Sequence, residues 1–235
     1  MRAVILAGGK GARLRPYTTV IPKPLIPLGE RPILEILIGQ LARTGVERID
    51  LCVGHLGRLI ETYFADSRTL PGSIDLRYHW EAEPLGTAGA LAQIDDLDEP
   101  FLTLNGDILT NLDYAHLMRS HTERGGALTI ATHTKKTQLE LGVIEEEGGE
   151  VTAYIEKPKF SHTVSMGIYA YDPSVLDHIH HDRLDFPDVV RTLLDAGQRV
   201  TTYAFDGEWF DIGTVEELAR AHEFLESNPR VFNLG

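Results

Sequence analysis

Short apolar segments alternate with amphipathic segments through the first half of the chain, and this alternation limits the folds that it can adopt. The apolar segments 2–7 and 48–53 are short enough for buried strands, and residues 33–41 between them repeat apolar side chains at helical spacing. Parallel strands need a long crossover connection, usually a helix, because a tight turn joins only antiparallel neighbours. The sequence therefore predicts an α/β fold with a mainly parallel, mixed sheet flanked by helices.

The second half of the chain is expected to add strands to the same sheet. Strands are predicted at 128–133, 142–146, 151–155, 165–171 and 200–205, followed by a closing helix at 215–225. The pair Gly148-Gly149 favours a hairpin turn between the second and third of these strands. Because no repeat, low-complexity tract or linker interrupts the pattern, we expect one domain over residues 1–235.

Charge and cysteine usage exclude several classes of function. The chain carries 22 Lys plus Arg against 35 Asp plus Glu, and its net charge of -13 would repel nucleic acid and anionic membranes. Cys52 is the only cysteine and stands in an apolar run, so we expect a buried strand residue with no disulfide. No apolar stretch approaches the ~18 residues of a membrane span, and Val4–Ala7 is too short for a signal-peptide core. We therefore expect a cytoplasmic protein.

A glycine-rich loop with several cations follows the first predicted strand. Glycines at positions 8, 9 and 11 allow backbone N–H groups to approach a phosphate closely, and Arg13 and Lys23 supply positive charge that could balance a triphosphate. The P-loop pattern is excluded because Ala12 follows Gly11, and the dinucleotide fingerprint fails where Leu14 replaces its third glycine. Taken alone, the segment could also be a structural turn with solvated cations.

Two aspartates stand next to predicted elements, one directly after a strand and the other before a helix. Asp107 comes directly after the buried segment 101–104, and Asp211 follows two aromatic residues and precedes a helix that Thr214 could cap. Mg2+ prefers oxygen ligands and binds proteins through one or two carboxylates together with substrate phosphates. These aspartates are therefore candidate magnesium ligands, although each could instead be a turn residue or stabilise a helix N-terminus.

Two further loops lie where predicted strands end, at the edge where open α/β sheets bind ligands. In segment 81–89, Pro84 and Gly86 fix an unusual backbone path, and small side chains leave room for a flat ring. The alternative is an ordinary strand-to-helix loop with Thr87 as the N-cap. Lys157 ends another predicted strand, where it could meet a second phosphate or remain a solvated edge lysine.

Together these segments resemble the sugar-phosphate nucleotidylyltransferase family, also called NDP-sugar pyrophosphorylases, from Arg2 to about Leu225. The resemblance implies a Rossmann-like mixed α/β fold, an NTP and a sugar 1-phosphate as binding partners, and Mg2+ as cofactor. The implied reaction transfers a nucleoside monophosphate to the sugar phosphate and releases pyrophosphate. A homodimer is left open. Members often carry a C-terminal left-handed β-helix, which we do not expect here because its hexapeptide repeats are absent up to Gly235.

The resemblance also implies roles for individual residues. Arg13, Lys23 and Asp107 would be catalytic, and Asp107 and Asp211 would bind Mg2+. Lys23 would contact the reacting α-phosphate, Glu81 would lie beside the base, and Lys157 would hold the sugar 1-phosphate. The residues that it places at the substrates are Gly8, Gly9, Gly11, Glu81, Gly86, Thr87, Glu156, Lys157 and Gly167.

The identity of the base rests on Glu81 and the segment that follows it. An ionised carboxylate has acceptors only, and guanine offers it two adjacent donors where uracil and thymine offer one. Segment 83–89 also looks closest to mannose-1-phosphate and heptose-1-phosphate guanylyltransferases, so we predict GTP with a hexose or heptose 1-phosphate. Thymidylyl or uridylyl transfer to glucose 1-phosphate or a related sugar phosphate stays open, as does a non-catalytic nucleotide-sensing domain. A nicotinamide oxidoreductase fits less well because the third fingerprint glycine is missing.

Overall fold

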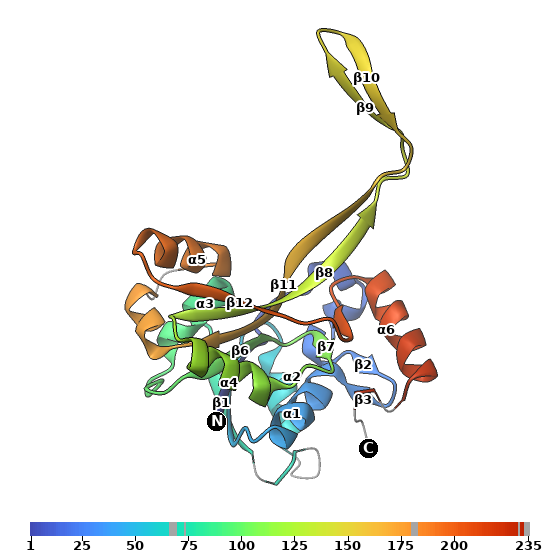
Figure 1. Cartoon of the computed structure of the whole chain (residues 1–235). Coiled ribbons are helices and arrows are strands. Elements are labelled where there is room, and N and C mark those ends of the chain that lie inside the picture. Colours follow the sequence, from blue (N-terminus) through green and yellow to red (C-terminus); the bar gives the residue numbers. More distant parts are fainter. Residues whose placement is uncertain (66–69, 73, 180–182, 230, 233–235) are drawn as a thin grey trace.

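A mixed seven-stranded sheet crosses the centre of the computed structural model, which describes residues 1–65, 70–72, 74–179, 183–229 and 231–232 (Figure 1). In spatial order the strands are β12 (Val200–Ala204), β8 (Leu128–Gln138), β11 (Lys159–Tyr171), β6 (Phe101–Asn105), β1 (Arg2–Leu6), β4 (Arg48–Val53) and β5 (Asp75–Trp80). Strands β6, β1, β4 and β5 are parallel, β11 is antiparallel to both neighbours, and β12 is parallel to β8. The predicted mixed α/β sheet is confirmed, and the strands predicted at 128–133, 165–171 and 200–205 join it. The strands predicted at 142–146 and 151–155 do not, because they form a separate two-stranded sheet.

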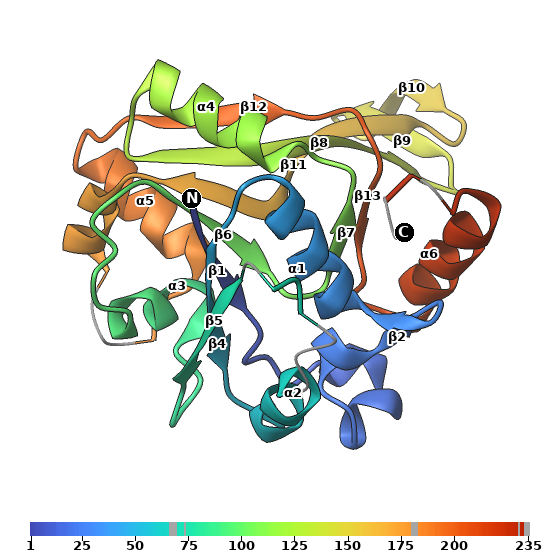
Figure 2. The same cartoon turned by 90° about the horizontal axis from the view of Figure 1, so that it is seen from below.

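Helices cover both faces of this sheet (Figures 1 and 2). One face packs against α1 (Ile33–Arg43), α2 (Gly57–Phe64) and α4 (Tyr114–Arg124), and the other against α3 (Gly86–Gly89) and α5 (Phe186–Asp195). Because strand side chains alternate between faces, Ile5 contributes to the first core and Val4 to the second. Cys52 lies fully buried in the second core, as predicted, and burial raises the pKa of its thiol. Among the described residues, no helix combines the length and the apolar character that crossing a membrane requires.

A third apolar cluster attaches α6 (Val215–Ser227) to the edge of the molecule, beside the short strands. The short strands are β2 (Pro27–Leu28), β3 (Arg31–Pro32), β7 (Ile108–Thr110) and β13 (Trp209–Asp211). Short 3₁₀ helices complete the fold at Ala12–Leu14, Tyr17–Thr19, Lys23–Leu25, Ala90–Gln93 and Pro173–His178. Thr214 caps α6, since its hydroxyl accepts a hydrogen bond from the Glu217 backbone N–H at 3.2 Å. The cap fixes the point at which β13 turns into the helix.

A long ribbon leaves the sheet where β8 and β11 continue past their other partners. Strand β12 pairs with β8 only as far as Thr132, and β6 pairs with β11 only from Ile168 onward. The segment 134–164 between these points, called the arm below, ends in the hairpin β9 (Val143–Glu147) and β10 (Glu150–Ile155) and projects well beyond the rest of the molecule (Figure 1). The Gly148-Gly149 turn of that hairpin is confirmed. The predicted strand at 128–133 ended too early, and the predicted strand at 165–171 began too late.

A buried ion-pair network ties β1 to β4 near their amino ends, on the side opposite the loops described next. Asp50 is fully buried and accepts hydrogen bonds from Arg2 at 2.5 Å and Arg48 at 3.1 Å, and His79 lies 2.8 Å away. Both arginines also contact Asp96. Burial alone would raise the pKa of Asp50, but the hydrogen bonds from Arg2, His79 and Arg48 outweigh it and hold that pKa below its usual value.

Candidate active site

The loops that follow β1, β5 and β6 converge at one edge of the sheet, because parallel strands end on the same side. Backbone hydrogen bonds tie these loops to neighbouring strands: Gly106 N–H donates to the Leu6 carbonyl at 2.9 Å, and Glu81 N–H donates to the Val53 carbonyl at 2.9 Å. Three of the segments chosen from the sequence therefore meet in space, although they are separated by tens of residues along the chain.

A cavity of about 260 Å³ opens between these loops, and we call it the glycine-loop pocket. Its lining consists of Leu6, Gly8, Gly9, Glu81, Pro84, Gly86, Thr87, Asn105 and Asp107. The structure thus brings together six of the residues predicted at the site, those at positions 8, 9, 81, 86, 87 and 107. Asn105 was not among the predicted site residues, although it stands two positions before the predicted aspartate at the end of the same strand.

Glu81 shapes this pocket through its contacts on two sides. One carboxylate oxygen accepts a hydrogen bond from the Leu85 backbone N–H at 3.1 Å and so holds the loop that follows it. The other oxygen lies 2.5 Å from where a Cβ on Gly8 would stand, so any side chain at position 8 would collide with the carboxylate. A side chain at position 8 would therefore have to displace the Glu81 carboxylate from this position.

The loop that carries Gly86 and Thr87 is fastened to the segment before α5. Gly86 has φ +82°, and a Cβ there would stand 2.5 Å from the Leu184 carbonyl oxygen, so both conformation and space demand glycine. The Thr87 hydroxyl accepts a hydrogen bond from Phe186 N–H at 2.7 Å, and Thr87 N–H donates to Asp185 at 3.2 Å. Thr87 is thus not the N-cap of α3, and its hydrogen bonds hold one wall of the pocket.

Lys23, Asp107 and Asp211 form a compact charged cluster beside this pocket. The Lys23 ammonium forms an ion pair with one oxygen of Asp107, and the two side chains are only 12% and 18% exposed. The other oxygen of Asp107 is buried and has no hydrogen-bond partner among the described residues. Asp211 stands opposite Ile108 in the β13–β7 pair, and Ile212 N–H donates to the Asp107 carbonyl at 3.0 Å. Two aspartates from distant parts of the sequence are therefore neighbours.

The charges of this cluster perturb Asp211. Loss of solvent around its carboxyl group and the negative charge of Asp107 raise its pKa, and Lys23 and Arg13 oppose the shift. The Arg13 guanidinium lies close by, 3.2 Å from where a Cβ on Gly213 would stand. Gly11 also lies beside the charged cluster, because a Cβ added to Gly11 would be 3.1 Å from the Cβ of Lys23. The glycine-rich loop thus delivers two cations to a pair of carboxylates.

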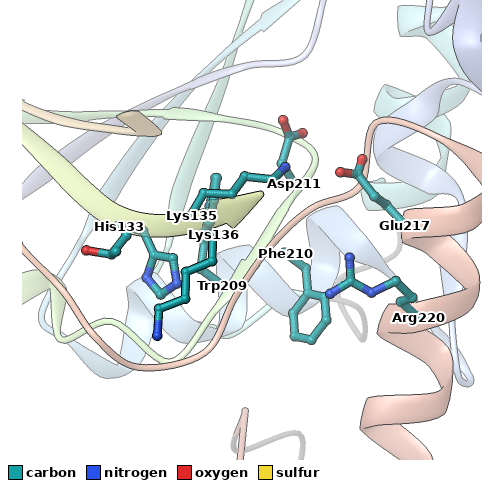
Figure 3. A pocket seen from close by; sticks show the side chains of 9 residues that line it. His133, Lys135, Lys136, Trp209, Phe210, Asp211, Glu217 and Arg220 are labelled. Atoms are coloured by element: carbon teal, nitrogen blue, oxygen red, sulfur yellow. The ribbon is translucent and has the colours of Figure 1, made fainter. Parts of the chain in front are cut away.

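A second cavity, of about 270 Å³, lies on the Asp211 side of the cluster (Figure 3). Its lining consists of His133, Thr134, Lys135, Lys136, Trp209, Phe210, Asp211, Glu217 and Arg220, and we call it the cation-lined pocket. Sequence reasoning identified Asp211 alone among these residues. Lys135 and Lys136 were missed because the predicted strand ended at residue 133, and Arg220 because nothing in the sequence separates it from other exposed helix residues.

The three remaining predicted site residues, Gly167, Glu156 and Lys157, do not lie in one place. Gly167 has φ +71° and packs against Asn105, whose amide nitrogen lies 2.5 Å from where a Cβ on Gly167 would stand. Glu156 and Lys157 instead lie on the arm, in and beside the connection between β10 and β11, and line neither pocket. The Lys157 ammonium is 3.1 Å from Glu140, and its backbone has φ +46°, a conformation uncommon for lysine.

Comparisons with known proteins agree with this geometry. UTP–glucose-1-phosphate uridylyltransferase of Synechocystis is 34% identical, with 94% of this chain and 62% of the relative covered. The mannose-1-phosphate guanylyltransferase catalytic subunit beta of Dictyostelium discoideum is 32% identical over 91% of this chain and 61% of its own length. The chain spans about three fifths of the length of these curated relatives.

A solved structure shares the fold closely. HddC from Yersinia pseudotuberculosis, in its complex with GMP-PN, superposes with a TM-score of 0.73 at 25% identity, covering 95% of this chain and 99% of that chain. The sequence pattern of the family described as Nucleotidyl transferase matches residues 2–228, nearly the whole chain. The chain therefore belongs to the nucleotidyl transferase family.

Proposed function

We propose that this protein transfers a nucleoside monophosphate from an NTP to a sugar 1-phosphate and releases pyrophosphate. The observation that carries the proposal is the meeting of two pockets at one charged cluster, because Asp107 lines the first pocket and its neighbour Asp211 lines the second. Two substrates could approach the cluster from its two sides, as an in-line displacement at phosphorus requires. The names of the relatives, a uridylyltransferase and a guanylyltransferase that act on sugar 1-phosphates, support the same reaction.

Asp107 and Asp211 are suited to hold Mg2+. The buried oxygen of Asp107 that has no hydrogen-bond partner among the described residues is an available ligand atom. Asp211 is its neighbour, and burial together with the negative charge of Asp107 raises the pKa of Asp211. Mg2+ binds proteins through one or two carboxylates and completes its shell with water and substrate phosphates. When bound, the ion would supply positive charge beside the phosphates.

Lys23 and Arg13 would stabilise the charge that develops during transfer. Both substrates are anions, so the main obstacles are their mutual repulsion and their positioning, which cations held in advance reduce. The ion pair with Asp107 fixes the ammonium of Lys23, and the glycine-rich loop offers backbone N–H groups to the remaining phosphates. The displacement itself needs no nucleophile from the chain.

GTP is the proposed donor, and a hexose or heptose 1-phosphate the proposed acceptor. Glu81 lines the glycine-loop pocket, and a carboxylate can accept both adjacent donors of guanine. Since one of its oxygens already accepts the Leu85 N–H, the arrangement would rely on the second lone pair of that oxygen or on the other oxygen. UTP and dTTP are the competing donors.

The reaction is tested by incubating the protein and Mg2+ with each of GTP, UTP, dTTP, ATP and CTP against mannose, glucose and heptose 1-phosphates. Pyrophosphate release with at least one pair, and its loss in Lys23→Ala, is the expected result. Release of pyrophosphate by none of the pairs, from a protein that still binds nucleotide, would instead support a nucleotide-sensing domain. A preference for UTP or dTTP would revise the base and leave the reaction in place.

A further inference from the structure

The hairpin at the end of the arm has an apolar face that nothing in the described part of the chain covers. Ile144 stands opposite Tyr154, and Val151 stands opposite Glu146, two residues along the strand from Ile144. Because side chains alternate between the faces of a ribbon, Ile144, Tyr154 and Val151 lie on the same face. They are 56%, 63% and 66% exposed. Neighbouring apolar side chains with this exposure indicate an interaction surface.

The arm is also open along both of its long edges. Strands β9 and β10 form a sheet of only two strands. The root of the arm, defined as residues 134–138 and 159–164, is likewise a ribbon in which β8 and β11 pair with each other and with no other described strand. A two-stranded ribbon is only marginally stable by itself in water, and open edges are places where a second chain can dock. The arm therefore has the form of an element that a partner completes.

Charge is distributed unevenly along the arm. The root contains Lys135, Lys136 and Lys159 and no acidic residue. The hairpin, residues 143–155, contains no lysine or arginine but has four glutamates, Glu145, Glu146, Glu147 and Glu150. Within the described residues, none of these charged side chains forms an ion pair. The two ends of the arm thus carry opposite charges that its own contacts do not neutralise.

These two ends are complementary to each other when two arms run in opposite directions. A two-fold axis across the middle of the arm sets the hairpin of each copy beside the root of the other, so that both contacts join opposite charges. The two parts have similar lengths, since β9 has five residues and β8 contributes residues 134–138 to the root. Arms that ran in the same direction would instead bring glutamates against glutamates and lysines against lysines.

We propose that two copies of this chain form a homodimer through their arms, which lie antiparallel with the acidic hairpin of each copy beside the basic root of the other. The exposed apolar side chains of the hairpins are buried between the arms. Because each arm projects well beyond its own body, the two bodies lie at opposite ends of the pair (Figure 1). This separation limits the repulsion between two chains that each carry a net charge of -13.

The test measures the mass of the full chain by sedimentation velocity over a series of protein concentrations. The wild type should be a dimer that dissociates on dilution, and raised salt should weaken it because the charges are exposed. One variant reverses the hairpin (Glu145→Lys/Glu147→Lys/Glu150→Lys) and another the root (Lys136→Glu/Lys159→Glu). In each variant like charges meet at both contacts, so the Kd of the dimer should rise at least ~100-fold.

An equimolar mixture of the two reversed variants separates the proposed pairing from a general loss of structure. The positive hairpin of the first variant then meets the negative root of the second, and the other contact keeps its original charges. The mixture should therefore form a heterodimer, which also demonstrates that both variants fold. A mixture that remains monomeric, although circular dichroism shows both variants folded, would overturn the proposal.

The control is Asp98→Lys/Glu99→Lys/Glu123→Lys, which changes the net charge as much as the hairpin variant does but at exposed positions on the body. It should dimerise like the wild type. A wild type that is monomeric at every concentration would show that no second copy covers the arm. A dimer that persists unchanged in both reversed variants would place the contact elsewhere on the molecule. Either result would overturn the proposal.

Discussion

The side chains of Lys23 and Asp107 hold each other in place, while the other carboxylate oxygen of Asp107 has no partner in the part of the chain that the structure describes. In the interior of a protein such an oxygen is costly unless a ligand engages it, because its hydration has been lost. The ion pair orients Lys23 before any substrate arrives, and electrostatic stabilisation depends on that kind of preorganisation. The site therefore depends on a few side chains that their neighbours hold in place.

Replacing Lys23 or Asp107 with alanine should slow turnover by at least ~100-fold, since removing one preorganised group at developing charge commonly costs about 3 kcal/mol. Initial rates at saturating substrates measure the effect. Circular dichroism should show that both variants fold. A near-normal rate in either folded variant would remove that residue from the mechanism.

Glu81→Gln tests recognition of the base. The glutamine amide has one acceptor oxygen where the carboxylate has two. The Leu85 N–H needs that oxygen, so the amide NH2 group, a donor, would face the donors of guanine. The value of kcat/KM for GTP should fall by the equivalent of roughly 1 to 3 kcal/mol. The comparison uses all four ribonucleotides and dTTP in both proteins. Unchanged use of GTP by the variant would separate Glu81 from the base.

Strands β1 and β4 combine two tasks at their opposite ends. The carboxyl end of β1 leads into the glycine-rich loop, and the segment after β4 contacts that loop through the His55 N–H, which donates to the Gly8 carbonyl at 3.4 Å. Near the amino ends of the two strands, the buried Asp50 binds Arg2 and Arg48. A buried carboxylate with two arginine partners is stable only while all partners are present, because each charge has lost its hydration. The network therefore fixes the register of the strands that position the glycine-rich loop.

Asp50→Asn should lower the free energy of unfolding by about 3 kcal/mol at pH 7, because it leaves two arginines without their buried counter-charge. The folded-state pKa of Asp50 lies below its unfolded value, so its stabilising effect is present above pH ~4 and is lost as the pH falls through the folded pKa. The difference between the proteins should therefore shrink below pH ~4. Urea unfolding at pH 7 and at lower pH measures it.

Asp75→Asn is the matched control, since Asp75 forms an exposed pair with Arg77 on β5. An exposed ion pair contributes less than about 1 kcal/mol, so this variant should unfold close to the wild type at every pH. Equal destabilisation by the two substitutions would show that the buried network has no special role.

The elements differ in how far the sequence could predict them. The parallel strands were predictable because burial on both faces of a sheet selects apolar runs. Asp107 was predictable because ligand-binding loops follow the carboxyl ends of such strands. The hairpin at the end of the arm was predicted as well, from its two short strands and the Gly148-Gly149 turn. The ribbon that carries this hairpin was not, since residues 134–138 are polar or charged and face no core that would impose alternation on them. Lys135 and Lys136 were missed for the same reason, and only the tertiary structure brings them to Asp211.

At the scale of the whole molecule, the arm is separate from the three apolar clusters that stabilise the fold. None of its described residues belongs to the buried members of these clusters, whereas several of its large apolar side chains are exposed. Those side chains are Leu139, Leu141, Ile144, Val151, Tyr154, Ile155 and Phe160. The body of the molecule therefore does not depend on the arm for its core.

Replacing residues 139–158 with an Asn-Gly turn should change the free energy of unfolding by less than about 1 kcal/mol, because no buried core contact is removed. Gln138 and Lys159 already stand opposite each other, so a two-residue turn can join them. Thermal and urea unfolding measure the stability of the shortened protein. A loss of several kcal/mol would reveal contacts of the arm that stabilise the body.

The pairing within the arm has a consequence for how its length can change over evolutionary time. Side chains alternate between the faces of a ribbon, so inserting one residue would reverse every face beyond it, whereas inserting two residues in each strand preserves them. Each such step would lengthen the ribbon by ~7 Å. The reach of the hairpin can thus vary in discrete increments while the sheet, the glycine-rich loop and the paired aspartates stay as they are, which allows the periphery to diversify without loss of the reaction.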